Sequence, residues 1–188
     1  ISMISRKFFL GSGAGHGGRS PERGLLRRSL NRIGPRTAGR YLFDLQRDPG
    51  LAIWIVGDGR SGTTWLGELL AGPRGLRKMF EPFYPFKVKA AAGFHPFHYE
   101  RPTASVPPLE RFFREVFTGT FTHPRVDRFE RGLLFRGRVV KDIFANLLLG
   151  WADFRFPEVA KIVMVRHPFA VAASKSRLKN WDWMSDPE

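Results

Sequence analysis

Residues 53–70 read IWIVGDGRSGTTWLGELL and pass from an apolar strand pattern, through a glycine-rich turn, into an amphipathic helix pattern. The run over residues 51–56 is almost wholly apolar, as in a parallel strand that is covered on both faces. Apolar residues at 65, 66, 69 and 70 have helical spacing, and Ala71-Gly72-Pro73 ends the helix. Strand, turn and helix in this order predict one βα unit of an α/β fold.

The glycine-rich turn between this strand and this helix is a predicted anion site. Glycines at 57, 59 and 62 let the backbone turn tightly, so that successive N–H groups and the helix N-terminus point at one anion. Arg60 adds a cation, and Ser61, Thr63 and Thr64 add hydroxyl donors. We therefore expect the turn to bind a phosphate-like group.

Two further strand–turn–helix units follow along the chain. Residues 138–142 have a strand pattern, and a helix is predicted after them through about residue 151. Residues 161–165 have another strand pattern, followed by a helix over 169–178 with Pro168 in its first turn. The three repeats predict an α/β fold in which an open parallel sheet is covered by helices. The expected architecture is a P-loop-like three-layer sandwich, held incompletely by this chain.

The region between the first two units is less regular. Residues 109–117 have helical spacing, whereas residues 87–108 are rich in Pro, Phe and His and are predicted to form a long surface loop. Residues 118–136 are mixed and polar. Ahead of the loop, residues 79–85 read MFEPFYP and place one carboxylate, that of Glu81, in an otherwise aromatic patch.

The composition limits the class of protein. With 188 residues, 43% of them hydrophobic, the chain is long enough for one α/β domain with a sizeable core. The absence of cysteine excludes disulfides and thiolate metal sites, and the five histidines show no metal-ligand spacing, so we expect no metal. No apolar run approaches the roughly 20 residues that a membrane span requires. We therefore expect a soluble, cytoplasmic protein.

The formal net charge of +14 suits a polyanionic ligand, because the guanidinium fork matches phosphate and sulfate oxygens. Residues 1–50 hold ten of the 31 Lys and Arg residues and three of the 17 Asp and Glu residues, which is half of that charge. We interpret this segment as a basic, partly flexible leader before a domain over residues 51–188. The charge leaves a basic nucleic-acid-binding protein as an alternative, but nothing else supports it, and we expect no nucleic-acid partner.

Polar clusters fall at the carboxyl ends of the three predicted strands. They are residues 60–64, Lys141 with Asp142, and Arg166 with Ser174. Because a parallel sheet brings the carboxyl ends of its strands to one edge, we expect cations that are distant in the sequence to converge on one multiply charged ligand.

A nucleotide kinase or other nucleoside triphosphatase is a second alternative. Gly57 and Gly62 have the spacing of the loop Gly-x-x-x-x-Gly-Lys-Ser/Thr. However, Thr63 occupies the lysine position, and the nearest cation has moved to Arg60. The lysine that reaches the β- and γ-phosphates is therefore missing, which argues against this class.

Residues 60–66, RSGTTWL, resemble the 5′-phosphosulfate-binding loop of the sulfotransferases that use 3′-phosphoadenosine 5′-phosphosulfate (PAPS), written Lys/Arg-Ser-Gly-Thr-Thr-Trp. The second signature of that family is an Arg at the end of a strand with a Ser eight residues later, both of which bind the 3′-phosphate. Arg166 and Ser174 match this spacing. The resemblance covers roughly residues 51–181 and is closest to the carbohydrate and bacterial-type members.

The resemblance implies transfer of a sulfuryl group from PAPS to an acceptor hydroxyl, such as that of a carbohydrate, by in-line displacement and without a metal. It implies that Trp65 lies against adenine, although the residue's helical position leaves the helix core as an equal alternative. The residues that it assigns to PAPS are Arg60, Ser61, Gly62, Thr63, Thr64, Trp65, Arg166 and Ser174.

The acceptor hydroxyl needs a base, because an alcohol is a poor nucleophile until its proton is removed. Cytosolic family members have a His two residues after a strand-end Lys, where this sequence has Ile143 after Lys141. The segment Phe80-Glu81-Pro82 resembles the Phe-Glu-Pro segment of carbohydrate sulfotransferases, so Glu81 is the predicted base, with a structural salt bridge as its alternative. Asp142 ranks second. The predicted catalytic residues are Glu81, Arg60 and Lys141.

The two ends of the sequence indicate a fragment, because it begins with Ile1 and stops at Glu188 in a polar stretch. By the resemblance it holds the N-terminal two-thirds of a sulfotransferase domain. Family members continue with an aromatic residue that closes over adenine and a glycine-rich loop that completes the 3′-phosphate site. Neither is found before Glu188, so we expect the isolated chain to bind PAPS weakly or not at all.

Overall fold

The structure is a computed structural model that describes residues 43–72, 75–95, 98–130 and 132–178. Most of the predicted basic leader, residues 1–42, lies outside the described residues. The leader's last residues, 43–50, are described, and they contact the domain that follows.

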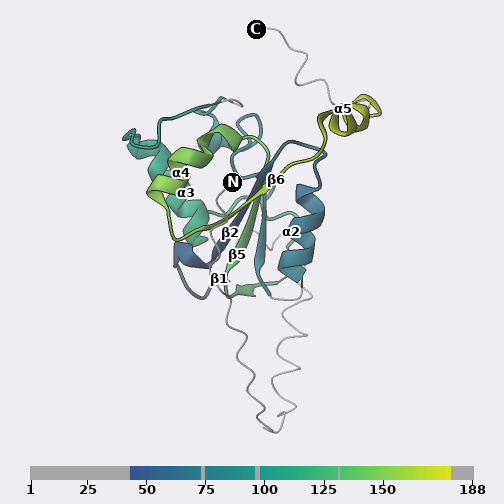
Figure 1. The fold of residues 1–188 in the computed structure, drawn as a ribbon. Helices are drawn as coiled ribbons and strands as arrows, with labels where there is room; N and C mark the ends of the chain where they lie inside the picture. The colour runs from purple at the N-terminus through teal and green to yellow at the C-terminus, as the bar shows by residue number, and fades with distance from the viewer. Residues whose placement is uncertain (1–42, 73–74, 96–97, 131, 179–188) are drawn as a thin grey trace, which may run out of the picture.

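A four-stranded sheet forms the centre of the described chain (Figure 1). The strand order is β3–β5–β2–β6, and every neighbouring pair is parallel. All four carboxyl ends therefore lie at one edge of the sheet, and the predicted α/β fold with an open parallel sheet is confirmed. The strands are β2 (Ala52–Gly57), β3 (Arg77–Phe80), β5 (Arg138–Asp142) and β6 (Ala160–Met164).

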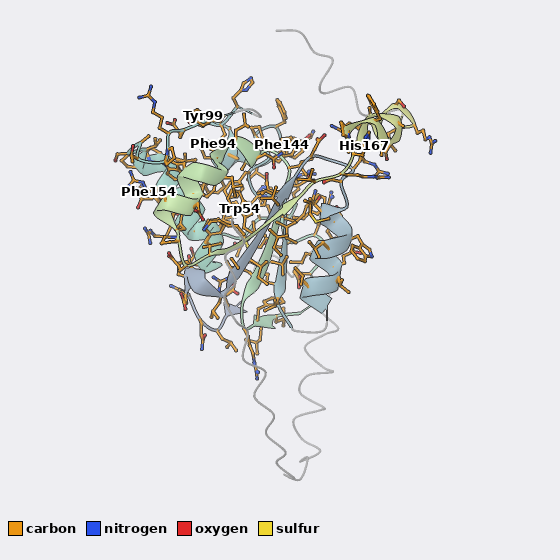
Figure 2. The ribbon with its side chains drawn as sticks, viewed as in Figure 1. Trp54, Phe94, Tyr99, Phe144, Phe154 and His167 are labelled. Atoms are coloured by element: carbon orange, nitrogen blue, oxygen red, sulfur yellow. The ribbon has the colours of Figure 1, made fainter. Side chains whose placement is uncertain are left out.

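One face of the sheet packs against helices α3 (Pro107–Thr118) and α4 (Leu149–Arg155). Trp54 of β2 is fully buried there, and its ring meets that of Phe113 edge-on at 5.6 Å between centroids. Figure 2 shows Trp54 in the interior between the sheet and these helices. Because successive strand residues point to opposite faces, Ile55 lies on the other side of the sheet.

The other face packs against helix α2 (Thr63–Ala71), whose Leu66 and Leu70 join Ile55 and Val139 in a second, smaller apolar cluster. The sheet thus lies between two helical layers (Figure 1). Helix α5 (Pro168–Ser176) instead lies beyond the carboxyl end of β6. Within the described ranges, no helix combines the length and apolar character needed to cross a membrane.

The predicted strands over 51–56, 138–142 and 161–165 are confirmed as β2, β5 and β6, and the predicted helices within 64–70, 109–117 and 169–178 as α2, α3 and α5. The helix expected straight after β5 begins later, because the Asp142 side chain first turns the backbone by accepting from Phe144 and Ala145. The remaining short elements are β1 (Phe43–Asp44), η2 (Pro49–Leu51), η4 (Lys89–Ala91), β4 (Leu134–Phe135) and η5 (Asn146–Leu148).

Two arginines at the amino ends of the strands are completely buried, and carboxylates pair with both. Arg77 bonds Asp44 at 3.0 Å and Asp127 at 2.8 Å, while Arg138 lies 3.4 Å from Asp44. Backbone carbonyl groups accept further bonds from these guanidinium groups, among them that of Gly119 at 2.7 Å from Arg77. The pairing explains how charged residues occupy the sheet, and it fixes residues 43–50 to the domain.

Candidate functional site

The turn between β2 and α2 has the backbone geometry that the sequence predicts for an anion site. Gly62 caps α2 in the left-handed region at φ 101°, and Arg60 also has a positive φ of 72°. A Cβ atom at Gly57 would lie 2.5 Å from the carbonyl oxygen of Met164, so only glycine fits there. The first N–H groups of α2, which have no intrahelical partners, therefore open onto the carboxyl edge of the sheet.

The segment between β6 and α5 meets this turn directly. The Arg166 guanidinium donates from Nη1 to the carbonyl oxygen of Arg60 at 3.0 Å, and Arg60 donates from Nε to Oγ of Ser174 at 3.0 Å. Lys175 forms a second link through an ion pair with Asp58 at 2.7 Å. The two sequence signatures, predicted to converge because of the parallel sheet, are in contact. Figure 2 shows His167 at the start of α5, remote from the core, and this residue is exposed.

The carboxyl ends of β3 and β5 bring Glu81 and Lys141 together. Lys141 Nζ lies 2.5 Å from Glu81 Oε1, and Arg125 Nη2 lies 2.9 Å from Glu81 Oε2. The backbone N–H of Glu81 donates to the carbonyl oxygen of Lys141 at 2.7 Å. Glu81 has a positive φ of 51°, which an L-residue adopts only under strain. The salt bridge considered for Glu81 from the sequence is thus present, and it involves two cations.

A cavity of about 530 Å³ joins these groups at the carboxyl edge of the sheet. It contains every predicted site residue except Ser174, which reaches it through Arg60. The Trp65 side chain lines the cavity and is 65% exposed, so the helix-core alternative for this residue is wrong. The lining residues are Gly59, Arg60, Ser61, Gly62, Thr63, Thr64, Trp65, Phe80, Glu81, Lys141, Ile143 and Arg166.

Asp142 is fully buried and does not line that cavity. Its carboxylate accepts from the backbone N–H groups of Phe83 at 3.0 Å, Phe144 at 2.6 Å and Ala145 at 3.0 Å. Burial raises the pKa of the Asp142 carboxyl to about 6, against the opposing effect of these hydrogen bonds. The contacts fix the segment after Glu81 to the segment after β5, so Asp142 positions the site and has the surroundings of a structural carboxylate.

Sequence reasoning missed Arg125 and Arg128, which lie in the mixed stretch after α3. The Arg125 guanidinium stacks over the Tyr84 ring at 4.4 Å, and that of Arg128 over the Phe80 ring at 4.3 Å. The excess of arginine in the sequence was the only signal for them. Their contacts depend on tertiary packing, which local patterns do not encode.

The charge at this edge of the sheet is strongly positive. Arg60 and Arg166 lie at the α2 turn, and Lys141 and Arg125 share the single carboxylate of Glu81. Such an arrangement favours anions and concentrates them at the cavity. The site therefore has the chemistry to hold a ligand with more than one negative group.

Comparison of the chain with protein-family models, with curated proteins and with solved structures found no match. Support for a function therefore comes from the motifs, from the geometry that brings them together and from the chemistry of the cavity.

Proposed function

We propose that the protein is a PAPS-dependent sulfotransferase, which transfers a sulfuryl group from PAPS to an acceptor hydroxyl. The observation that carries the proposal is the hydrogen-bonded chain from Ser174 through Arg60 to Arg166, which joins the two signatures. A simple phosphate loop requires no second anion site. A donor with a phosphosulfate at one end and a 3′-phosphate at the other requires two, held at a fixed separation.

In this proposal the α2 N-terminus and the hydroxyl groups of Ser61, Thr63 and Thr64 bind the 5′ end of PAPS. Arg166 and Ser174 bind the 3′-phosphate. The exposed ring of Trp65 lies against adenine, which its place in the cavity supports.

In the reaction, the acceptor oxygen forms a bond to sulfur while the bond from sulfur to the bridging phosphate oxygen breaks. The electron pair of the breaking bond remains on the phosphate, and Arg60 and Lys141 stabilise its developing charge. The acceptor proton passes to the Glu81 carboxylate. Because Lys141 and Arg125 hold both Glu81 oxygens, one of these ion pairs opens before Glu81 accepts the proton.

Transfer of radiolabelled sulfate from PAPS to a hydroxyl acceptor, measured on the protein extended beyond residue 188, tests the proposal. Arg60→Ala and Glu81→Ala should each lower kcat by about 10²–10³, the usual cost of removing one group that acts in the transition state. Arg136→Ala is the matched control, because Arg136 is exposed at the opposite end of the strands and should leave kcat unchanged. If Arg60→Ala and Glu81→Ala both keep the kcat of the wild type, the proposed sulfotransferase function is wrong.

The kinase alternative predicts instead that ATP binds only with Mg²⁺, since the metal and the loop lysine together hold the β- and γ-phosphates. The side chain at the lysine position, Thr63, is buried and carries no charge. The geometry therefore adds nothing to this alternative.

A further inference from the structure

We propose that the acceptor carries a carboxylate beside the hydroxyl that is sulfated, and that Arg125 and Arg128 bind this carboxylate. The inference rests on the proposed function and names the chemical class of its acceptor. It arises from a group of cations around the ring of Phe80.

Three cations surround the Phe80 ring. Lys141 Nζ lies 4.5 Å from the ring centroid, and the guanidinium carbons of Arg128 and Arg125 lie 4.3 Å and 6.0 Å from it. Phe80 lines the cavity beside Glu81. Neither guanidinium group lines the cavity itself: Arg125 contacts it through Glu81, and Arg128 contacts it through Phe80.

In the described part of the chain, the three cations around Phe80 share one paired carboxylate, that of Glu81. Glu81 pairs with both Lys141 and Arg125, and among the described residues Arg128 forms no ion pair. Partial burial and the neighbouring charge of Arg125 lower the pKa of the Arg128 guanidinium, against the opposing charge of Glu81, and the side chain stays exposed. A bound carboxylate would accept the paired N–H groups that this exposed guanidinium presents in a plane.

The ion pair between Arg125 and Glu81 links the charge of the acceptor to the predicted base, Glu81. Arg125 occupies Glu81 Oε2 at 2.9 Å. A carboxylate on the acceptor competes with Glu81 for Arg125, and its binding frees Oε2 for the acceptor hydroxyl. The hydroxyl proton then passes to Glu81 as the new sulfur–oxygen bond forms. A neutral acceptor lacks the group that displaces Arg125.

Two acceptors test this inference, 4-nitrophenyl β-D-glucuronide and 4-nitrophenyl β-D-xyloside. They share the same ring hydroxyl groups and differ in the carboxylate. With PAPS as donor, kcat/KM for the glucuronide should exceed that for the xyloside by about tenfold, the value of one charge-assisted contact. Equal values, or a preference for the xyloside, would overturn the inference.

Variants of Arg128 test whether the preference for the glucuronide over the xyloside comes from this residue. Arg128→Gln should lower the glucuronide-to-xyloside ratio of kcat/KM severalfold, because only Arg125 then binds the carboxylate. Arg128→Lys should lower it less, and the exposed control Arg136→Gln should leave it unchanged. A ratio that survives Arg128→Gln contradicts the assignment. Unchanged circular dichroism and melting temperature of each variant show that it folds.

Saturation-transfer NMR without PAPS separates this inference from the proposed function. Glucuronide binding that Arg128→Gln weakens supports the carboxylate site even if no sulfuryl transfer occurs, an outcome that would refute only the proposed function. Equal signals from the two glycosides, or signals from neither, would refute the carboxylate site whatever the transfer assay shows.

Discussion

Arg60 donates a hydrogen bond from Nε to Oγ of Ser174 at 3.0 Å, although the two residues lie 114 positions apart in the chain. Arg60 belongs to the turn before α2, and Ser174 belongs to α5. The bond therefore joins the carboxyl ends of β2 and β6, which are neighbours in the sheet. It makes one site of two motifs that are separate in the sequence.

Loss of the Ser174 hydroxyl should weaken binding of adenosine 3′,5′-bisphosphate. We expect Ser174→Ala to raise Kd by about tenfold, because one hydrogen bond to the 3′-phosphate is lost. Ser176→Ala is the control, since the Ser176 hydroxyl bonds the carbonyl oxygen of Ala173 within the same helix. Titration calorimetry measures both, and equal Kd values for Ser174→Ala and the wild type would exclude the role of Ser174.

The positive φ of Arg60 should affect the relative stability of variants at this position. Arg60→Gly should be more stable than Arg60→Ala by about 1 kcal/mol, because glycine adopts this conformation without strain. Both variants lose the same side-chain contacts, so the difference reports on the backbone. At the exposed helical position Glu115 the order should reverse, with alanine more stable by about 1 kcal/mol. Urea unfolding that ranks Arg60→Ala above Arg60→Gly would contradict the backbone geometry.

The buried pairing at the amino ends of the strands should contribute strongly to stability. Asp44→Ala removes a carboxylate, 3% exposed, that pairs with both Arg77 and Arg138. We expect a loss of about 3–5 kcal/mol, because uncompensated charges remain buried. Asp153→Ala breaks an ion pair with Lys161 whose carboxylate is 70% exposed, and should cost less than about 1 kcal/mol. Similar unfolding free energies for the two variants would show that residues 43–50 are not held as described.

Glu130 should make stability depend on pH. Burial raises the pKa of its carboxyl from 4.5 to about 6, so the folded state holds the proton more tightly than the unfolded state. Its stabilising contribution is complete below pH 4.5 and is lost as the pH rises through about 6.

Glu130→Gln keeps the acceptor for the Lys78 backbone N–H, which lies 2.7 Å from Oε1. Relative to the wild type, this variant should gain about 1–2 kcal/mol between pH 4 and pH 7. Urea unfolding at a series of pH values measures this gain. Parallel stability curves for the two proteins would rule out the raised pKa.

The parts of the fold that could be predicted are those whose local pattern matches their surroundings. Strand β2 is apolar because helices cover the sheet on both faces, and Pro168 begins α5 where its fixed φ suits a first turn. Strand β3 was missed, because it begins with Arg77 and Lys78. The charge of Arg77 is matched by Asp44 and Asp127, which are distant in the sequence, so no local pattern reveals that it is buried.

In the candidate site, the residues at strand ends could be predicted, but a residue that arrives by tertiary packing could not. The parallel topology brings residues 60–64, Lys141 and Arg166 to one edge, as expected from strand ends alone. Arg125 could not be found in this way, because it reaches Glu81 by packing across Tyr84. Helical spacing could not decide whether Trp65 lies in the helix core or lines the site, because both positions fit the sequence pattern of α2.

The central claim is that the cavity edge binds a donor with two anionic ends, and Arg166 tests it most directly. Calorimetry of the same extended protein in EDTA should show that adenosine 3′,5′-bisphosphate binds at least about tenfold more tightly than adenosine 5′-phosphate, and that Arg166→Ala removes this difference. Equal Kd values for the two nucleotides in the wild type, or tighter binding of ATP with Mg²⁺ than of the bisphosphate, would contradict it.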